Sequence, residues 1–361
     1  MSRYTAAVIG TGPDPETQTV ESFAMGYRHA EAYRRHDDIE VVACADVVPE
    51  NAEAFADEFD CAAYEDYEEM LADAAPDVVS VTVPPAIHED IIVGCARSGV
   101  VDAIHAEKPI ADTWGGAKNA VQECWRNDVQ LTFNRQRRFL KPFTEAKRLL
   151  DAGEVGELRQ VEITWGDFFD TGAHTIDLAG MFNDDRPAEW IIAQLDYREE
   201  DVRFGMHQEN QMLAQWRYEN GVHGTLTTGA GADLHDSAFR VRGTEGDILI
   251  DVEDGPMLAV ERGGERDAID VEGETIHSTP EDERFHSVPI ERAVADAIAC
   301  LGTDEESGLS GRIGLNTAEI VFGGYESVRR RGRVDFPLDV EDNAFAAMVE
   351  EGVVGPDADA E

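Results

Sequence analysis

The first 134 residues alternate short apolar runs with amphipathic segments, and this alternation limits the possible folds more than any other feature. Apolar runs bounded by turns are typical of buried strands, and the segments between them have helical periodicity. Strands that alternate with helices predict βαβ units and a parallel sheet. The predicted strands are residues 4–9, 40–45, 77–83, 100–106 and 129–133. We therefore predict an α/β domain with a parallel sheet over residues 1–134.

A glycine turn, Gly10-Thr11-Gly12, follows the first predicted strand. Glycines at a strand end allow a tight turn and the close approach of a pyrophosphate, which then meets a helix N-terminus. The motif is not contiguous, because an insertion separates Gly12 from Gly26, our candidate for the third glycine. Asp46 ends the second strand, 20 residues after Gly26, where an acid accepts hydrogen bonds from ribose hydroxyls. This pattern predicts a dinucleotide-binding Rossmann domain, and the acid favours NAD over NADP.

The ends of the later strands are expected to meet the nicotinamide half of the cofactor, since ligands bind beyond the carboxyl ends of parallel strands. The candidate cofactor-binding residues there are Thr82, Pro84, His88, Glu107 and Asn134. The alternative for His88 is an ordinary place in the first turn of a helix.

Lys108 follows the fourth strand within Glu107-Lys108-Pro109, in a chain that contains four lysines in all. A retained lysine at a strand end suggests a catalytic role, and the alternative is an ordinary lysine in solvent.

The second half, residues 135–361, predicts a different architecture. Beyond residue 182, strand-like runs follow one another without helices, and hairpin turns such as Asn220-Gly221 separate them. We therefore predict an α+β domain for substrate binding and oligomerisation, with a large, mostly antiparallel open sheet. Helices predicted at 286–300 and 309–330 are expected to pack back on the first domain.

Asp170 and His174 lie four residues apart in a predicted helix and its lead-in, so that they share one face. An imidazole near neutral pH is suited to take a hydroxyl proton, and a nearby ammonium can stabilise the developing alkoxide. Alternatively, Asp170 caps the helix and His174 is structural. Asp177 completes a trio that could hold a metal, but a further ligand is missing, so we predict no metal. Trp165 is a candidate substrate contact, and Asp167, Phe168 and Phe169 are predicted to line the same pocket.

Composition narrows the class of protein further. The 75 acidic residues against 30 lysines and arginines give a net charge of −45, which repels nucleic acid and anionic membranes. An acidic, lysine-poor surface over an ordinary core indicates adaptation to high salt, where charge repulsion is screened. No run approaches the ~18 apolar residues of a membrane span, and the N-terminus does not resemble a signal peptide. We therefore expect a cytoplasmic protein.

The sequence resembles the glucose-fructose oxidoreductase/inositol dehydrogenase (Gfo/Idh/MocA) superfamily, in a haloarchaeal version. The resemblance rests on AVIGTG, ACADVVPENAEAFADEF, VVSVTVPPAIHED, AEKPIA, FNRQRRF, LLDAGEVGELRQVEITWG and DTGAHTIDLA. It implies a catalytic Lys108, followed by a proline that is often cis, with Asp170 and His174 as its partners in catalysis and substrate binding.

The resemblance also implies NAD(P)-dependent oxidation of a hydroxyl on an aldose- or inositol-type sugar or polyol, by a homodimer or homotetramer. The alternative is a non-catalytic, cofactor-binding regulator on the same fold.

Overall fold

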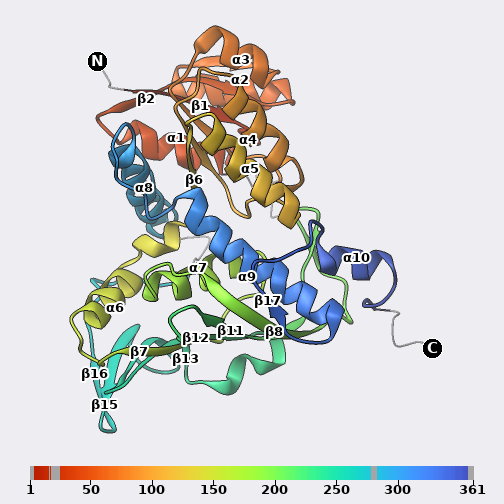
Figure 1. Cartoon of the computed structure of the whole chain (residues 1–361). Coiled ribbons are helices and arrows are strands. Elements are labelled where there is room, and N and C mark those ends of the chain that lie inside the picture. Colours follow the sequence, from red (N-terminus) through yellow and green to blue (C-terminus); the bar gives the residue numbers. More distant parts are fainter. Residues whose placement is uncertain (1–3, 16, 18–24, 278–282, 357–361) are drawn as a thin grey trace. The chain divides into compact units, whose positions relative to one another are not determined.

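The computed structural model describes residues 4–15, 17, 25–277 and 283–356, and it divides into two compact units (Figure 1). The first unit comprises residues 1–136 and 282–315, and the second comprises 137–281 and 316–361. The segment 282–315, which includes α8 (Glu283–Cys300), thus belongs to the N-terminal unit. The two units are described separately below.

The first unit is built on a six-stranded parallel sheet in the order β3-β2-β1-β4-β5-β6, which confirms the Rossmann prediction. Its strands are β1 (Tyr4–Ile9), β2 (Ile39–Ala45), β3 (Ala62–Tyr64), β4 (Val78–Val81), β5 (Ala103–Ala106) and β6 (Gln130–Phe133). The helices between them are α1 (Gly26–Arg34), α2 (Pro49–Phe59), α3 (Tyr67–Ala74), α4 (His88–Arg97) and α5 (Trp114–Arg126). The carboxyl ends of all six strands therefore lie along one edge of the sheet.

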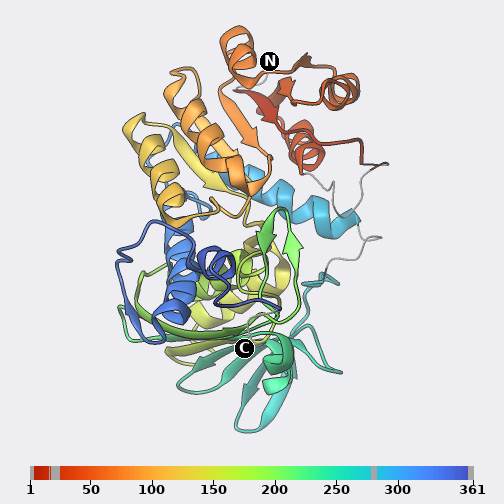
Figure 2. The same ribbon diagram turned by 90° about the vertical axis from the view of Figure 1, so that its right-hand side faces the viewer.

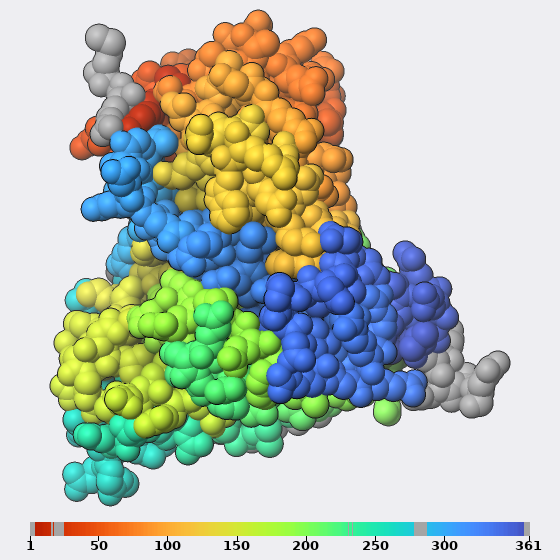
Figure 3. All heavy atoms as spheres, in the orientation of Figure 1, coloured from red at the N-terminus to blue at the C-terminus, as the bar shows by residue number. Residues whose placement is uncertain are grey.

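Helices cover the faces of this sheet, which explains its apolar sequence. Ala6, Ala7 and Val8 are fully buried, as expected for a strand covered on both faces. Residues of α8 and α1 share one core cluster with Ala6. α4 and α5 lie side by side at the surface (Figure 3). The Thr113 side chain caps α5 by accepting a hydrogen bond from the Gly116 N–H.

The second unit is built on a nine-stranded sheet in the order β16-β15-β14-β13-β7-β12-β11-β8-β17. All neighbouring strands are antiparallel except β7 and β12, which are parallel, so the predicted mostly antiparallel sheet is confirmed. The strands are β7 (Leu158–Ile163), β8 (Ala188–Asp196), β11 (Gln211–Tyr218), β12 (His223–Thr227), β13 (Ser237–Gly243), β14 (Asp247–Val252), β15 (Leu258–Arg262), β16 (Glu265–Ala268) and β17 (Val334–Asp335). A separate hairpin pairs β9 (Val202–Arg203) with β10 (Met206–His207).

Helices lie on one face of this larger sheet (Figure 2). They are α6 (Lys141–Asp151), α7 (Gly172–Phe182), α9 (Gly311–Arg330) and α10 (Ala344–Glu350). α9 approaches β8 closely at Gly323 and Gly324, where an added Cβ would lie 2.4 Å from the Phe336 ring and 2.5 Å from the Phe168 ring. Glycine is required at both positions because larger side chains would push the helix off the sheet.

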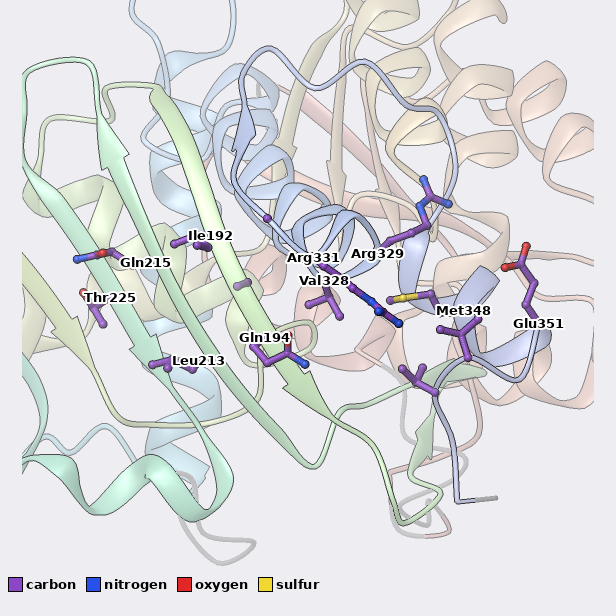
Figure 4. A pocket seen from close by; sticks show the side chains of 14 residues that line it. Ile192, Gln194, Leu213, Gln215, Thr225, Val328, Arg329, Arg331, Met348 and Glu351 are labelled. Atoms are coloured by element: carbon purple, nitrogen blue, oxygen red, sulfur yellow. The ribbon is translucent and has the colours of Figure 1, made fainter. Parts of the chain in front are cut away.

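The strands of the second unit alternate buried and exposed residues, which leaves apolar side chains on the open face. Ile192 on β8 is 46% exposed and Leu213 on β11 is 52% exposed. Beside them is a hollow of about 1000 Å³ between the sheet, the end of α9 and α10 (Figure 4). None of the predicted site residues lines this hollow.

Candidate active site

The glycine turn (residues 10–12) has the geometry expected of a phosphate-binding turn. Gly10 has φ +83° and Gly12 has φ +67°, which is the left-handed region that favours glycine. A Cβ on Gly10 would lie 2.7 Å from Val83 Cγ1. A Cβ on Gly26 would lie 2.9 Å from Thr11 Cα, so Gly26 allows α1 to begin directly against the turn. Most of the insertion before Gly26 lies outside the described residues.

Asp46, at the end of β2, supports this turn from the side. Its Oδ2 accepts hydrogen bonds from the Gly12 N–H at 2.9 Å and from Thr11 Oγ1 at 3.1 Å, while Oδ1 accepts from the Val48 N–H at 2.9 Å. The carboxylate is therefore fixed beside the glycine turn, where the fold places the adenosine half of a dinucleotide. Its predicted contact with the ribose stays a prediction.

Thr82 and Pro84 lie at the carboxyl end of β4, beside the glycine turn. Thr82 Oγ1 is 2.7 Å from the Gly10 carbonyl oxygen and 3.1 Å from that of Ile9, and it donates to this pair. The bond tethers the end of β4 to the end of β1. Pro84 caps the short 3-10 turn that begins α4.

His88 lies beneath the Lys108-Pro109 peptide bond, which is cis. Its Nδ1 is 2.6 Å from the Pro109 carbonyl oxygen and its Nε2 is 2.8 Å from the Val83 carbonyl oxygen. Burial lowers the pKa of His88, although both carbonyls favour the protonated ring. Because its two ring nitrogens contact backbone oxygens at the ends of β4 and β5, His88 tethers these two strand ends. Its predicted contact with a cofactor stays a prediction.

Glu107 and Asn134 lie at the ends of β5 and β6 and are joined to each other. Asn134 Nδ2 donates to Glu107 Oε1 at 2.6 Å, and His29 Nε2 lies 3.0 Å from the same oxygen. Sequence reasoning missed His29. The sequence feature that could have identified His29 is its position on the apolar face of α1, the helix that follows the glycine turn.

In the second unit, the lead-in to α7 gathers most of the predicted substrate residues. Asp167 accepts hydrogen bonds from the Thr171 N–H and Oγ1, both at 2.8 Å, and so fixes the turn that carries Asp170. His174 lies in the first turns of α7 and is 4% exposed.

The Arg137 guanidinium lies 4.3 Å from the centre of the Trp165 ring. Burial lowers the pKa of Arg137 to about 10, against the opposing charges of Asp170 and Asp167. The guanidinium of Arg137, which sequence reasoning did not single out, is therefore the cation around which Trp165, Asp167 and Asp170 are grouped.

The prediction that Phe168 and Phe169 line a pocket is wrong. Phe168 is fully buried and Phe169 is 4% exposed, and both pack against aromatic rings of α9. Beneath them lies Glu209, which sequence reasoning also missed. Its Oε1 accepts from the Phe168 N–H at 2.6 Å and its Oε2 accepts from Tyr325 at 3.0 Å. Burial, together with the charge of Asp167, raises the pKa of Glu209 to about 7.

Asp177 belongs to a buried ion cluster. Arg138 donates to both of its carboxylate oxygens, at 2.5 and 2.9 Å, and also to Asp185 at 2.6 Å. Among the described residues, no three histidine, cysteine or acidic side chains are grouped as a metal would require. The role of Asp177 is therefore to hold α7 against the start of α6.

Two family models match the chain, one on each side of the boundary between the units. "Oxidoreductase family, NAD-binding Rossmann fold" matches residues 20–135, and "GFO/IDH/MocA C-terminal domain" matches residues 166–249. The chain belongs to the Gfo/Idh/MocA family. Its first unit is therefore an NAD-binding Rossmann domain.

Curated relatives are similar at low identity. The chain is 22% identical to 2,7-anhydro-N-acetylneuraminate hydratase of Mediterraneibacter gnavus over 71% of this chain and 69% of the relative. It is 30% identical to inositol 2-dehydrogenase of Rhizobium meliloti over 49% of this chain and 53% of that protein. The match thus spans about half the length of several curated relatives.

Among solved structures, an oxidoreductase of Agrobacterium radiobacter in complex with NAD+, L-tartaric acid and magnesium superposes with a TM-score of 0.75. The identity is 18%, over 92% of this chain and 98% of that one, so the likeness shows the fold. Within the described parts of the Gfo/Idh/MocA chain, no helix is both long and apolar enough to cross a membrane.

Proposed function

We propose that this protein oxidises a hydroxyl group of a sugar or polyol, of aldose or inositol type, with NAD as the hydride acceptor. The observation that carries the proposal is the retention of Lys108, Asp170 and His174 together with an intact glycine turn and Asp46. A regulator that only binds the cofactor has no need of a lysine, a histidine and an acid at the family's catalytic positions. Inositol 2-dehydrogenases among the relatives support the same substrate class.

The residues of the first unit fit NAD on two structural grounds. Gly26 lets α1 begin directly against the glycine turn, because its Cβ would meet Thr11, and the N-terminus of a helix behind such a turn binds phosphate. Asn134 Oδ1 is a buried acceptor with no partner among the described residues, which suits a donor such as a carboxamide N–H. When bound, NAD supplies the acceptor for the hydride of the substrate carbinol.

Side chains of the protein carry out the proton transfer and stabilise the developing charge. His174 takes the hydroxyl proton as the carbinol carbon loses its hydride, so that the alcohol becomes a carbonyl and one proton remains with the protein. Lys108 stabilises the negative charge that develops on the reacting oxygen. Asp170 orients the substrate or the lysine, and Trp165 supplies an apolar wall.

The test is reduction of NAD, followed at 340 nm in molar KCl, with a panel of inositols, aldoses and other polyols. Lys108→Ala and His174→Ala are expected to lose at least 100-fold in kcat, a typical contribution for one acid–base or electrostatic group, and to retain NADH binding. Lys147→Ala is the matched control, because Lys147 forms surface ion pairs with Asp151 and Asp184. Full activity in either active-site variant contradicts the assignment, and NADH binding without turnover of any substrate favours the regulator.

We also infer that the protein forms a homodimer or homotetramer through the open face of the larger sheet. On this face, the neighbouring strands β8 and β11 expose the apolar side chains of Ile192 and Leu213. Such a face is stabilised when a second copy of the chain covers it. Leu213→Glu is expected to lower the mass measured by light scattering. Val202→Glu, on the separate β9–β10 hairpin and equally exposed, is the control. An unchanged mass for Leu213→Glu refutes this interface.

A further inference from the structure

A chain of buried polar side chains leads to Glu107 from the interior of the first unit. Tyr33 Oη lies 2.8 Å from Ser80 Oγ, and Ser80 Oγ lies 2.9 Å from His29 Nδ1. His29 Nε2 in turn lies 3.0 Å from Glu107 Oε1. Tyr33, Ser80 and His29 are each at most 1% exposed. We refer to these three residues as the Glu107 relay; two of them come from α1 and one from β4.

The hydrogen bonds of the relay run in one direction. A carboxylate at Glu107 only accepts, so His29 Nε2 carries the proton, and Nδ1 of a neutral ring is then an acceptor. The Ser80 hydroxyl must donate to Nδ1, which leaves its oxygen to accept from Tyr33. Every donor in the relay then has an acceptor. Buried polar groups that are all satisfied in this way hold one geometry.

Other titratable groups also face Glu107. His105 stacks on His29 with ring centres 4.9 Å apart, and burial together with His29 lowers the pKa of His105 to about 3. Lys108 also acts on Glu107 by charge, and the charge of Glu107 acts on His88. Burial by itself raises the pKa of Glu107, but the hydrogen bonds from His29 and Asn134 and the charge of Lys108 bring it below its ordinary value. His29 is the largest of these favourable influences.

The Glu107 carboxylate fixes two neighbours at the ends of β5 and β6. Oε2 lies 3.3 Å from the Lys108 N–H, and Oε1 holds the Asn134 amide by its nitrogen. A flipped Asn134 amide would place its oxygen against the carboxylate, so this orientation is enforced by charge. Asn134 Oδ1 is thereby kept as a fixed acceptor, while a neutral carboxyl group would tolerate either orientation.

We propose that His29 is a positioning residue of the nicotinamide site: through the Glu107 relay it keeps Glu107 as a carboxylate, which sets the Asn134 amide and the backbone at Lys108. The positioning of these two groups for NAD rests on the proposed function. The charge state of Glu107 does not depend on it. The two parts are therefore tested by separate measurements.

The charge state is tested by denaturant unfolding between pH 5 and pH 8 in molar KCl. In the wild type, Glu107 is ionised in both the folded and the unfolded chain over this range, so it contributes no slope. In His29→Leu, the folded-state pKa of Glu107 rises above the unfolded one, and its stabilising protonated form is lost as pH rises. Relative to His29→Gln, which likewise has no imidazole at position 29, the unfolding constant of His29→Leu should therefore increase by up to about tenfold per pH unit.

His29→Gln is the reference, because the amide N–H of glutamine can replace His29 Nε2–H and no imidazole remains at position 29 to titrate. The double variant His29→Leu/Glu107→Gln has neither group left to titrate and should run parallel to His29→Gln. His105→Gln, which changes a buried histidine that is hydrogen-bonded to Thr132, is the matched control for the NADH titration. If His29→Leu runs parallel to His29→Gln, His29 does not maintain the carboxylate.

The positioning is tested by fluorescence titration with NADH and with its 3-acetylpyridine analogue, which has no carboxamide N–H for Asn134 Oδ1. The wild type is expected to bind NADH about tenfold more tightly than the analogue, the value of one hydrogen bond. His29→Leu should lose this preference, while His29→Gln and His105→Gln keep it. Equal weakening of both ligands in His29→Leu means a merely structural role. Absence of NADH binding by the wild type refutes the proposed function and leaves the unfolding result intact.

Discussion

Replacement of Glu209 by glutamine should raise the stability of the protein above that of the wild type by more at pH 8 than at pH 5. Glu209 is 5% exposed, and the pKa of its carboxyl group is raised from the ordinary 4.5 to about 7 by burial and by the charge of Asp167. A group with a raised folded-state pKa stabilises the fold below the unfolded-state value. That contribution is lost as pH rises through the folded-state pKa.

The magnitude follows from the size of the shift. About 2.5 pH units at about 1.4 kcal/mol each give a loss of about 3 kcal/mol in the wild type between pH 5 and pH 8. Glutamine does not ionise, so the variant escapes this loss. Its amide oxygen can still accept from the Phe168 N–H, and any cost at Tyr325 is the same at both pH values. For a unit of 150–250 residues, this difference corresponds to about 6–12 °C in Tm.

The assay is thermal unfolding in molar KCl at several pH values, with the Tm difference between variant and wild type plotted against pH. Glu326→Gln is the control. Glu326 follows Tyr325 in α9, but its carboxylate accepts from Arg329 and Arg330, so this variant should lose stability. A constant Tm difference for Glu209→Gln from pH 5 to pH 8 would show that the buried carboxyl group has an ordinary pKa and would refute the reasoning.

Three further outcomes are expected. Arg138→Met should lower the free energy of unfolding, measured by urea titration, by about 3–5 kcal/mol, because it leaves Asp177 buried without its cation. The control is Arg159→Met, which removes an exposed ion pair with Glu157 and should change the free energy of unfolding by less than about 1 kcal/mol. Asp46→Ala should weaken NADH binding about tenfold and reduce discrimination against NADPH, as measured by fluorescence titration, since the glycine turn loses its support and the negative charge is removed. Transfer from molar KCl to dilute buffer should abolish the circular dichroism of the folded chain, because the net charge of −45 is then unscreened; an unchanged spectrum refutes salt dependence.

The sequence by itself determined the order of elements in the Rossmann unit and the local motifs. Apolar periodicity reports which face of a segment is buried, and this was sufficient to find β1, α1 and β2. Gly10 and Gly12 were recognisable because their turn requires positive φ angles that few other residues adopt. Lys108 was singled out because it follows a strand in a chain with four lysines, and its catalytic role stays a prediction.

Only the tertiary structure decided which polar side chains are buried together. Glu209 and Phe168 are 41 residues apart, Arg138 and Asp177 are 39 apart, and His29 and Glu107 are 78 apart. The parallel pairing of β7 with β12 belongs to the same class, since strands distant in sequence become neighbours. Periodicity carries no information about such pairs, because it shows that a side chain is buried but not which distant group meets it. The charge state of a buried group depends on that partner. The roles of Glu209 and His29 could therefore be recognised only from the tertiary structure.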